Sequence, residues 1–141
     1  MASDICAVSS CIVSKLLMTH VDKSRLFFVR SQGSESKRII ARCHGLPRIM
    51  QLALNQKPLY VIEVISEKFD KLSREDRIRV LIHELMHIPH SFGGGFRAHK
   101  PYVTQRNVDA MCEKFLLALA PDGLSSVFES VEDRSSKLRW R

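Results

Sequence analysis

Residues 83–87, His-Glu-Leu-Met-His, form the pattern H-E-x-x-H. Residues four apart are neighbours on a helix, so His83 and His87 can hold one metal ion from the same side. Glu84 points about 100° away from His83 and could reach a metal-bound water without becoming a ligand. With six histidines and eight glutamates in 141 residues, chance would give about 0.01 such patterns. The pattern therefore predicts a zinc site in which zinc lowers the pKa of a water and Glu84 removes its proton.

A catalytic zinc site has three protein ligands and one open position, so a third ligand is needed. His99 follows residues 91–98, a glycine-rich stretch that can turn the chain back toward the helix. We therefore favour His99 as the third ligand. The sequence leaves three alternatives open, namely Asp109, Glu113 and His90.

The helix that carries the motif is the best-specified element of the chain. Ser73 followed by Asp76 resembles a capping box, which predicts where this helix begins. Apolar residues at helical spacing then form one stripe, made of Ile78, Leu81, Ile82, Leu85 and Ile88. His83 and His87 lie almost opposite this stripe, and Pro89 must end or kink the helix. The alternative is a histidine-rich surface helix that binds no metal.

The remaining pattern predicts an α+β fold with a small antiparallel or mixed sheet, in one domain over residues 1–141. No internal repeat or low-complexity linker divides the chain. Expected helices cover about 4–18, 46–55 and 104–119, and expected strands cover 25–30, 37–43 and 58–65. A basic-aromatic tail follows at about 134–141. The strand at 58–65 is either a central strand or an edge to which an extended peptide could add.

Composition and cysteine usage narrow the class of protein. Hydrophobic residues at 45% and charged residues at 26% are ordinary for a globular protein. The four cysteines form no C-x-x-C pair, so a cysteine-ligated zinc ribbon is not expected, although a bridge between Cys43 and Cys112 stays open. Residues 5–18 are too short and too polar to span a bilayer, and the N-terminal residues lack the basic n-region of a signal peptide. We expect a cytoplasmic protein with no membrane partner.

The net charge of +7 favours anionic partners. Residues 22–48 carry seven basic residues against two acidic ones, which makes this region a candidate nucleic-acid surface or a solvated face. A second hypothesis follows from this charge: a basic module associated with nucleic acid or ribonucleoprotein, whose zinc site is structural or vestigial. The sequence makes no prediction of the oligomeric state.

Residues 38–102, above all the blocks HELMHIP and GGGFRAHK, resemble small metallopeptidases predicted in archaea and phages. These are minimal zincins, distantly similar to the SprT-like proteases, although this chain lacks the zinc ribbon of that group. The resemblance implies a zincin fold with an antiparallel strand beside the active-site helix. It also implies one zinc held by His83, His87 and His99, with Glu84 as the general base.

The sequence therefore predicts a zinc metalloendopeptidase that acts on an unfolded or extended polypeptide, since so small a chain has little room for a deep specificity pocket. Arg97 and Tyr102 lie close to His99 in the sequence, and either could stabilise the oxyanion of a tetrahedral intermediate. The alternatives are an arginine paired with a carboxylate and an ordinary half-buried tyrosine. If Asp109 is not a ligand, it could orient one of the zinc histidines.

Overall fold

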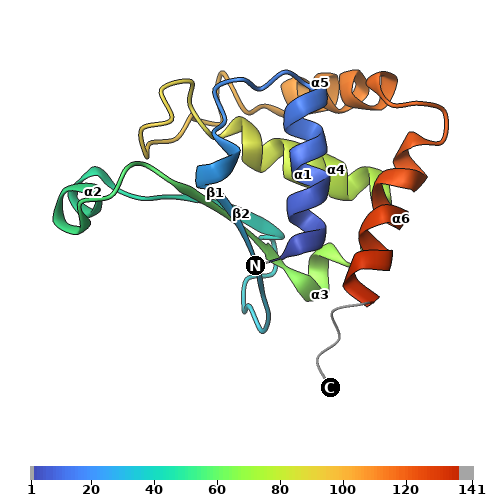
Figure 1. Cartoon of the computed structure of the whole chain (residues 1–141), viewed down its shortest axis with the longest axis horizontal. Helices are drawn as coiled ribbons and strands as arrows, with labels where there is room; N and C mark the ends of the chain where they lie inside the picture. Colours follow the sequence, from blue (N-terminus) through green and yellow to red (C-terminus); the bar gives the residue numbers. More distant parts are fainter. Residues whose placement is uncertain (1, 137–141) are drawn as a thin grey trace.

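The computed structural model describes residues 2–136, which form a three-stranded sheet and six α-helices (Figure 1). The helices are α1 Ser3–Lys15, α2 Arg48–Leu54, α3 Ser66–Phe69, α4 Arg74–Met86, α5 Gln105–Ala118 and α6 Gly123–Ser136. The strands are β1 Leu26–Ser31, β2 Ala41–Gly45 and β3 Tyr60–Ile65, and a 3₁₀ turn, Lys23–Arg25, precedes β1. The predicted α+β class is confirmed. None of the helices within residues 2–136 has the length and hydropathy that a bilayer-spanning segment requires.

The sheet is mixed, with the strand order β1-β3-β2. Strand β3 runs parallel to β1 and antiparallel to β2. Alternate residues of β3, Tyr60, Ile62 and Val64, are completely buried, so one face of the sheet packs on the core. Both edges of β3 are paired, which excludes peptide addition to this strand and leaves β2 as an edge strand.

Helices α1 and α4 pack together on the buried face of the sheet, with α1 crossing in front of α4 in Figure 1. Helix α1 contributes Ile5, Val8 and Ile12, which recur every three or four residues and are buried in one core with β3 and α4. Helix α5 packs against α4, and α6 packs against α1. Packing against α1, α5 and β2 therefore holds α4, the helix that carries the motif, in place without a bound ligand.

Several element boundaries differ from those expected. Helix α1 ends at Lys15 instead of residue 18, because Leu17 adopts a positive φ of 53° that ends the helical path. The second strand begins at Ala41, four residues later than predicted. Helix α6 was not predicted, since its serines give a low helix propensity, but Phe128 anchors it in the core. Residues 137–141 of the predicted tail, with Trp140, lie outside the described residues.

Candidate metal centre

Helix α4 begins where the capping pattern predicts and presents two faces. The Ser73 hydroxyl accepts a hydrogen bond from the Asp76 backbone N–H at 3.1 Å, which satisfies one free donor of the first turn. The whole apolar stripe is buried, whereas His83 and His87 are half-buried on the other face. The helix ends at Met86, three residues before Pro89. The core therefore fixes how the two histidines are oriented.

Two hydrogen bonds return the chain to the end of α4. The Arg97 backbone N–H donates to the His87 carbonyl at 2.8 Å. In the other direction, Nδ1 of His87 lies 2.8 Å from the Arg97 carbonyl and must donate to it, because a carbonyl oxygen only accepts. This reciprocal pair holds residue 97 against the helix, so His99 follows within reach of His83 and His87. It also leaves Nε2 of His87 as the ring nitrogen with a free lone pair.

The glycine-rich loop before Arg97 is held by side chains from elsewhere in the chain. The Tyr60 hydroxyl accepts a hydrogen bond from the Gly94 N–H and donates one to the Gly95 carbonyl, both at 2.8 Å. The Gln51 amide donates to the Gly93 carbonyl at 2.9 Å. The path of the loop is thus set by β3 and α2 as well as by α4.

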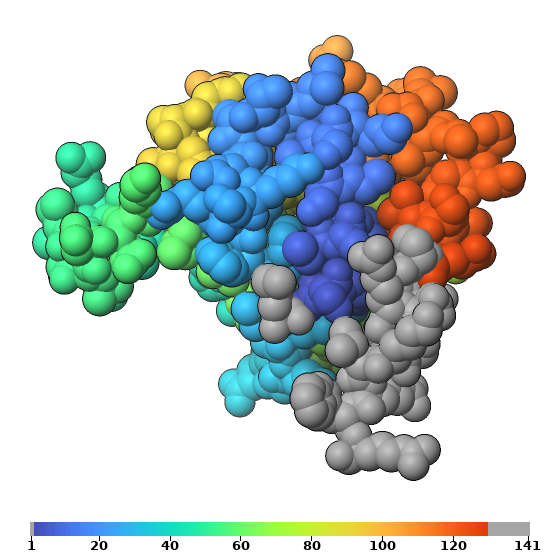
Figure 2. Space-filling view, viewed as in Figure 1, coloured from blue at the N-terminus to red at the C-terminus, as the bar shows by residue number. Residues whose placement is uncertain are grey.

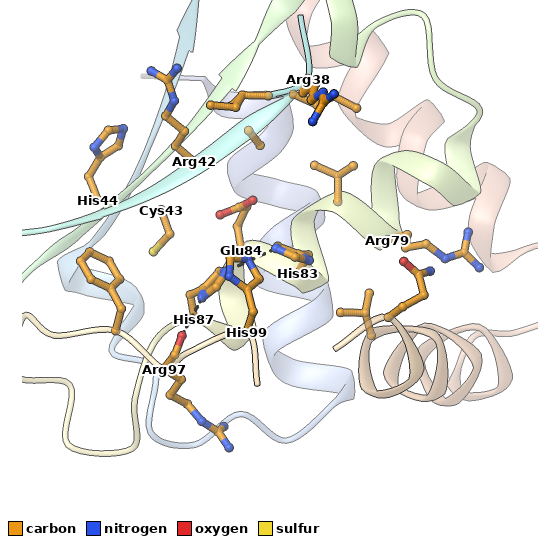
Figure 3. A pocket seen from close by; sticks show the side chains of 17 residues that line it. Arg38, Arg42, Cys43, His44, Arg79, His83, Glu84, His87, Arg97 and His99 are labelled. Atoms are coloured by element: carbon orange, nitrogen blue, oxygen red, sulfur yellow. Dashed lines mark hydrogen bonds between the residues drawn. The ribbon is translucent and has the colours of Figure 1, made fainter. Parts of the chain in front are cut away.

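His83, His87 and His99 come together at the base of a pocket (Figure 3). One nitrogen from each ring lies within 4.8 Å of the others, and the Nε2 atoms of His83 and His87 are 3.2 Å apart. The ring centroids are separated by 4.7–5.4 Å. Three imidazole nitrogens this close together fit a single metal ion.

The electrostatics of the cluster favour neutral rings. Burial, together with the charges of His87 and His99, lowers the pKa of His83 to about 4. Burial also lowers the pKa of His87, against the opposing hydrogen bond to the Arg97 carbonyl. Both rings are therefore neutral near pH 7 and keep the lone pair that a metal ion needs. Three imidazoles are a donor set that suits zinc.

Glu84 extends from α4 toward β2 and lies next to the cluster without joining it (Figure 3). Only 8% of this residue is exposed. Burial raises the pKa of the Glu84 carboxyl to about 7, although a hydrogen bond from the Cys43 backbone N–H acts in the opposite direction. A carboxyl with a pKa near neutrality can both take and return a proton at physiological pH. A cation held by the histidines would lower this pKa and favour the carboxylate.

The pocket above the cluster has a volume of about 910 Å³. One wall consists of residues 38–44, which include most of β2. The rest of the lining comes from α4, the loop that carries His99, and the first turn of α5. Glu84 is the one carboxylate among the described residues that line it, and the basic lining residues other than the histidines are Arg38, Arg42, Arg79 and Arg97. An extended chain can therefore lie between an edge strand and the histidines.

His90, a candidate ligand, and Tyr102, a candidate oxyanion stabiliser, both lie outside the pocket of the histidine cluster. The His90 ring contacts the His20 ring, with centroids 4.3 Å apart and the planes tilted by 45°, and His90 is not in the histidine cluster. The Arg97 guanidinium lies 4.5 Å from the centre of the Tyr102 ring and points away from the three histidines (Figure 3). Tyr102 lines a second cavity of about 410 Å³ and does not line the pocket of the cluster.

The two carboxylates considered as alternative third ligands, Asp109 and Glu113, also lie outside the histidine cluster. Asp109 accepts hydrogen bonds from the Arg79 guanidinium at 2.9 Å and from the Gln105 amide at 3.0 Å. It therefore pairs with an arginine and does not contact a cluster histidine. Glu113 lines a separate cavity of about 420 Å³ together with Asp109. Within the part of the chain that the structure describes, neither carboxylate belongs to the metal-binding group.

The basic residues of segment 22–48 do not form one free surface. Arg30 forms ion pairs with Asp4 and Asp70, and the Arg25 guanidinium donates to the Pro58 carbonyl. Arg38 and Arg42 instead line the pocket of the histidine cluster. All four cysteines are free thiols, so the bridge left open between positions 43 and 112 is not formed.

Some contributors to the site carry no signal in the sequence. The Cys43 N–H that reaches Glu84 and the Arg97 carbonyl that orients His87 are backbone groups, which any residue type would supply. Tyr60 and Gln51 hold the loop through partners more than thirty residues away. The run of three glycines was the one visible sign that the chain turns here.

Fold and site together define a small α+β protein with three histidines suited to a metal and a carboxyl beside them. The model of a protein family described as putative phage metallopeptidase matches residues 1–116, and the chain belongs to this family. The family indicates a metallopeptidase in general, acting on a polypeptide substrate. No curated protein and no solved structure matches the chain.

Proposed function

We propose that the chain is a zinc metalloendopeptidase in which His83, His87 and His99 hold one zinc ion and Glu84 is the general base. The observation that carries this proposal is the meeting of three imidazole nitrogens with a buried carboxyl in one pocket. The family supports the choice of a peptide bond as the bond that is cleaved. The proposal treats residues 1–141 as one domain.

Each group at the site has a separate role in the proposed reaction. When bound, the zinc ion would polarise the peptide carbonyl and make a water molecule easier to deprotonate. Glu84 accepts the proton of the attacking water on its carboxylate and returns it to the departing amine nitrogen. Its burial excludes bulk water from the carboxyl, and the Cys43 N–H fixes the orientation of the group. The Arg97 carbonyl orients His87 through Nδ1.

An extended polypeptide is the substrate that this pocket suits. Strand β2 is an edge strand and borders the pocket, so backbone groups on its outer side can pair with a substrate strand. Oxyanion stabilisation by Arg97 or Tyr102 stays a prediction. The Arg97 side chain points away from the cluster (Figure 3), and Tyr102 lines a different cavity. The distant relation to SprT-like proteases is likewise a proposal, supported by the blocks HELMHIP and GGGFRAHK.

The nucleic-acid hypothesis has less support. Arg25 and Arg30 make contacts within the protein, and Arg38 and Arg42 lie in the pocket wall. A structural zinc site also has no need of a buried carboxyl beside it.

The test compares Glu84→Gln with Glu113→Gln, which removes a carboxylate outside the pocket. Each zinc-loaded protein is incubated with an unfolded protein substrate, and new amino termini are counted by mass spectrometry. We expect Glu84→Gln to keep its zinc and to lose at least about 100-fold in rate, as removal of a general base typically does. Glu113→Gln should cleave at the wild-type rate. A zinc-loaded Glu84→Gln with full activity would refute the proposal.

A further inference from the structure

Helix α2 exposes its apolar side chains to solvent, whereas a helix of a globular protein usually buries them. Its large apolar residues are exposed, with Ile49 and Leu52 at 70%, Leu54 at 54% and Met50 at 44%. No residue of α2 is buried. At about 100° per residue, these side chains and Ala53 span roughly 200° of the helix circumference. The helix stands away from the body as a projection at the left of Figures 1 and 2.

The polar side of α2 is the side that holds it to the protein. Gln51 lies opposite the apolar arc, and its amide donates to the carbonyls of Leu46 and Gly93. The helix ends at Asn55, which adopts a left-handed conformation. Two hydrogen bonds from one amide thus fix the orientation in which the aliphatic side chains face solvent. An exposed apolar patch of this kind usually marks a contact surface.

The charged residues nearest the two ends of α2 in the sequence are basic. Between residues 36 and 62 the sequence contains no aspartate or glutamate, but it contains Lys37, Arg38, Arg42, Arg48 and Lys57. Arg48 begins the helix, and Lys57 follows it by three residues. A surface that is apolar and carries anionic groups would therefore complement the aliphatic side chains of α2 and the basic residues at its two ends.

We propose that α2 docks the protein on an anionic lipid surface, with Ile49 and Leu52 inserted among the acyl chains and Arg48 and Lys57 at the headgroups. A convex aliphatic tip with basic flanks fits the boundary between headgroups and acyl chains. The sequence analysis predicted no membrane partner because it found no bilayer-spanning segment, and a helix that lies on the surface of a bilayer needs none.

Other occupants fit the surface less well. A second copy related by a two-fold axis would oppose Arg48 and Lys57 with the same charges. A protein groove that binds a helix uses anchors seven residues apart, and α2 has only seven residues. Nucleic acid calls for aromatic or hydrogen-bonding side chains, whereas the outward residues of α2 are aliphatic. No residue of α2 lines the histidine pocket, so the exposed aliphatic surface is separate from it.

The test is cosedimentation of the full chain with vesicles of phosphatidylcholine alone or mixed with phosphatidylglycerol. The variants are Leu52→Ser, Ile49→Ser with Leu52→Ser, and the control Leu117→Ser, which changes an equally exposed leucine on α5. We expect wild type and Leu117→Ser to bind the anionic vesicles alike. Leu52→Ser should bind about tenfold more weakly, and the double variant about a hundredfold more weakly.

Three results would overturn the proposal. The first is a wild-type protein that stays in solution with anionic vesicles at low salt, which would leave an acidic protein groove as the occupant. The second is Leu52→Ser binding as tightly as wild type, since attraction would then come from net charge alone. The third is a lipid-free dimer, seen by analytical ultracentrifugation, that Leu52→Ser dissociates. Peptide cleavage enters none of these readouts, so the result is independent of the proposed function.

Discussion

Replacing Gly94 by alanine tests whether the loop that delivers His99 is held as described. Gly94 has a φ of 100°, a backbone conformation that alanine rarely adopts. A Cβ atom there would lie 2.4 Å from the Leu46 carbonyl oxygen and 2.6 Å from Nε2 of Gln51. The neighbouring Gly95 provides a matched control, because a Cβ atom on it would meet nothing within 4 Å.

The expected cost of Gly94→Ala follows from these two effects. A left-handed backbone costs a residue with a side chain about 1–2 kcal/mol. Displacing the Gln51 amide from its two carbonyl partners costs about 1 kcal/mol for each hydrogen bond lost. We therefore expect the free energy of unfolding to fall by about 3–4 kcal/mol in Gly94→Ala and by less than about 0.5 kcal/mol in Gly95→Ala.

The assay is urea unfolding of both variants and wild type in the presence of a chelator, so that metal binding does not contribute. A zinc competition titration of the same proteins should also show weaker binding by Gly94→Ala, because a loop that moves to relieve the clash displaces His99. Equal unfolding free energies for the two variants would refute the account of the loop.

Two further predictions concern groups away from the loop. Burial alone would raise the pKa of Asp4, but the hydrogen bond and charge of Arg30 lower it below its usual value of 3.8. This pair should stabilise the protein above pH 3.8 and cease to do so as the pH falls through the lowered pKa, so Asp4→Asn should lose that part of the acid dependence of urea unfolding. Burial, with a smaller effect of the Glu84 charge, raises the pKa of the Cys43 thiol to about 12. Roughly one such thiol in ten thousand is ionised at pH 8, so iodoacetamide should alkylate Cys43 about a thousandfold more slowly in the native than in the urea-unfolded protein, as measured by peptide mass spectrometry.

The helix that carries the motif could be predicted from the sequence because the features that define it lie close together along the chain. The cap at Ser73, the buried stripe and the two histidines are all set by residue type and spacing along one helix, and the structure has each of them there. The three strands were likewise found, with shifts of up to four residues at their ends.

The third histidine could be favoured from the sequence but not separated from Asp109 or Glu113. The path from His87 to His99 depends on backbone hydrogen bonds to Arg97 and on the Tyr60 hydroxyl, which residue types near the motif do not encode. Asp109 of α5 accepts a hydrogen bond from Arg79 of α4, and this pairing depends on how the two helices pack together.

Helix α2 shows the limit of periodicity as a guide to burial. Residues 46–55 have the apolar content of a buried helix, and the helix was predicted from that content. Gln51, the residue that hydropathy would place in solvent, finds two carbonyl partners on the protein, and the aliphatic residues consequently face outward.

The most direct test of the metal centre is the zinc content of wild type, His99→Ala and His90→Ala after mild chelation, measured by mass spectrometry of the metal. His90→Ala is the matched control, because His90 is closer to the motif in sequence than His99 but its ring contacts His20 outside the cluster. The account predicts one zinc per chain in wild type and in His90→Ala, and loss of zinc from His99→Ala. Retention of zinc by His99→Ala, or its loss from His90→Ala alone, would contradict the site built from His83, His87 and His99.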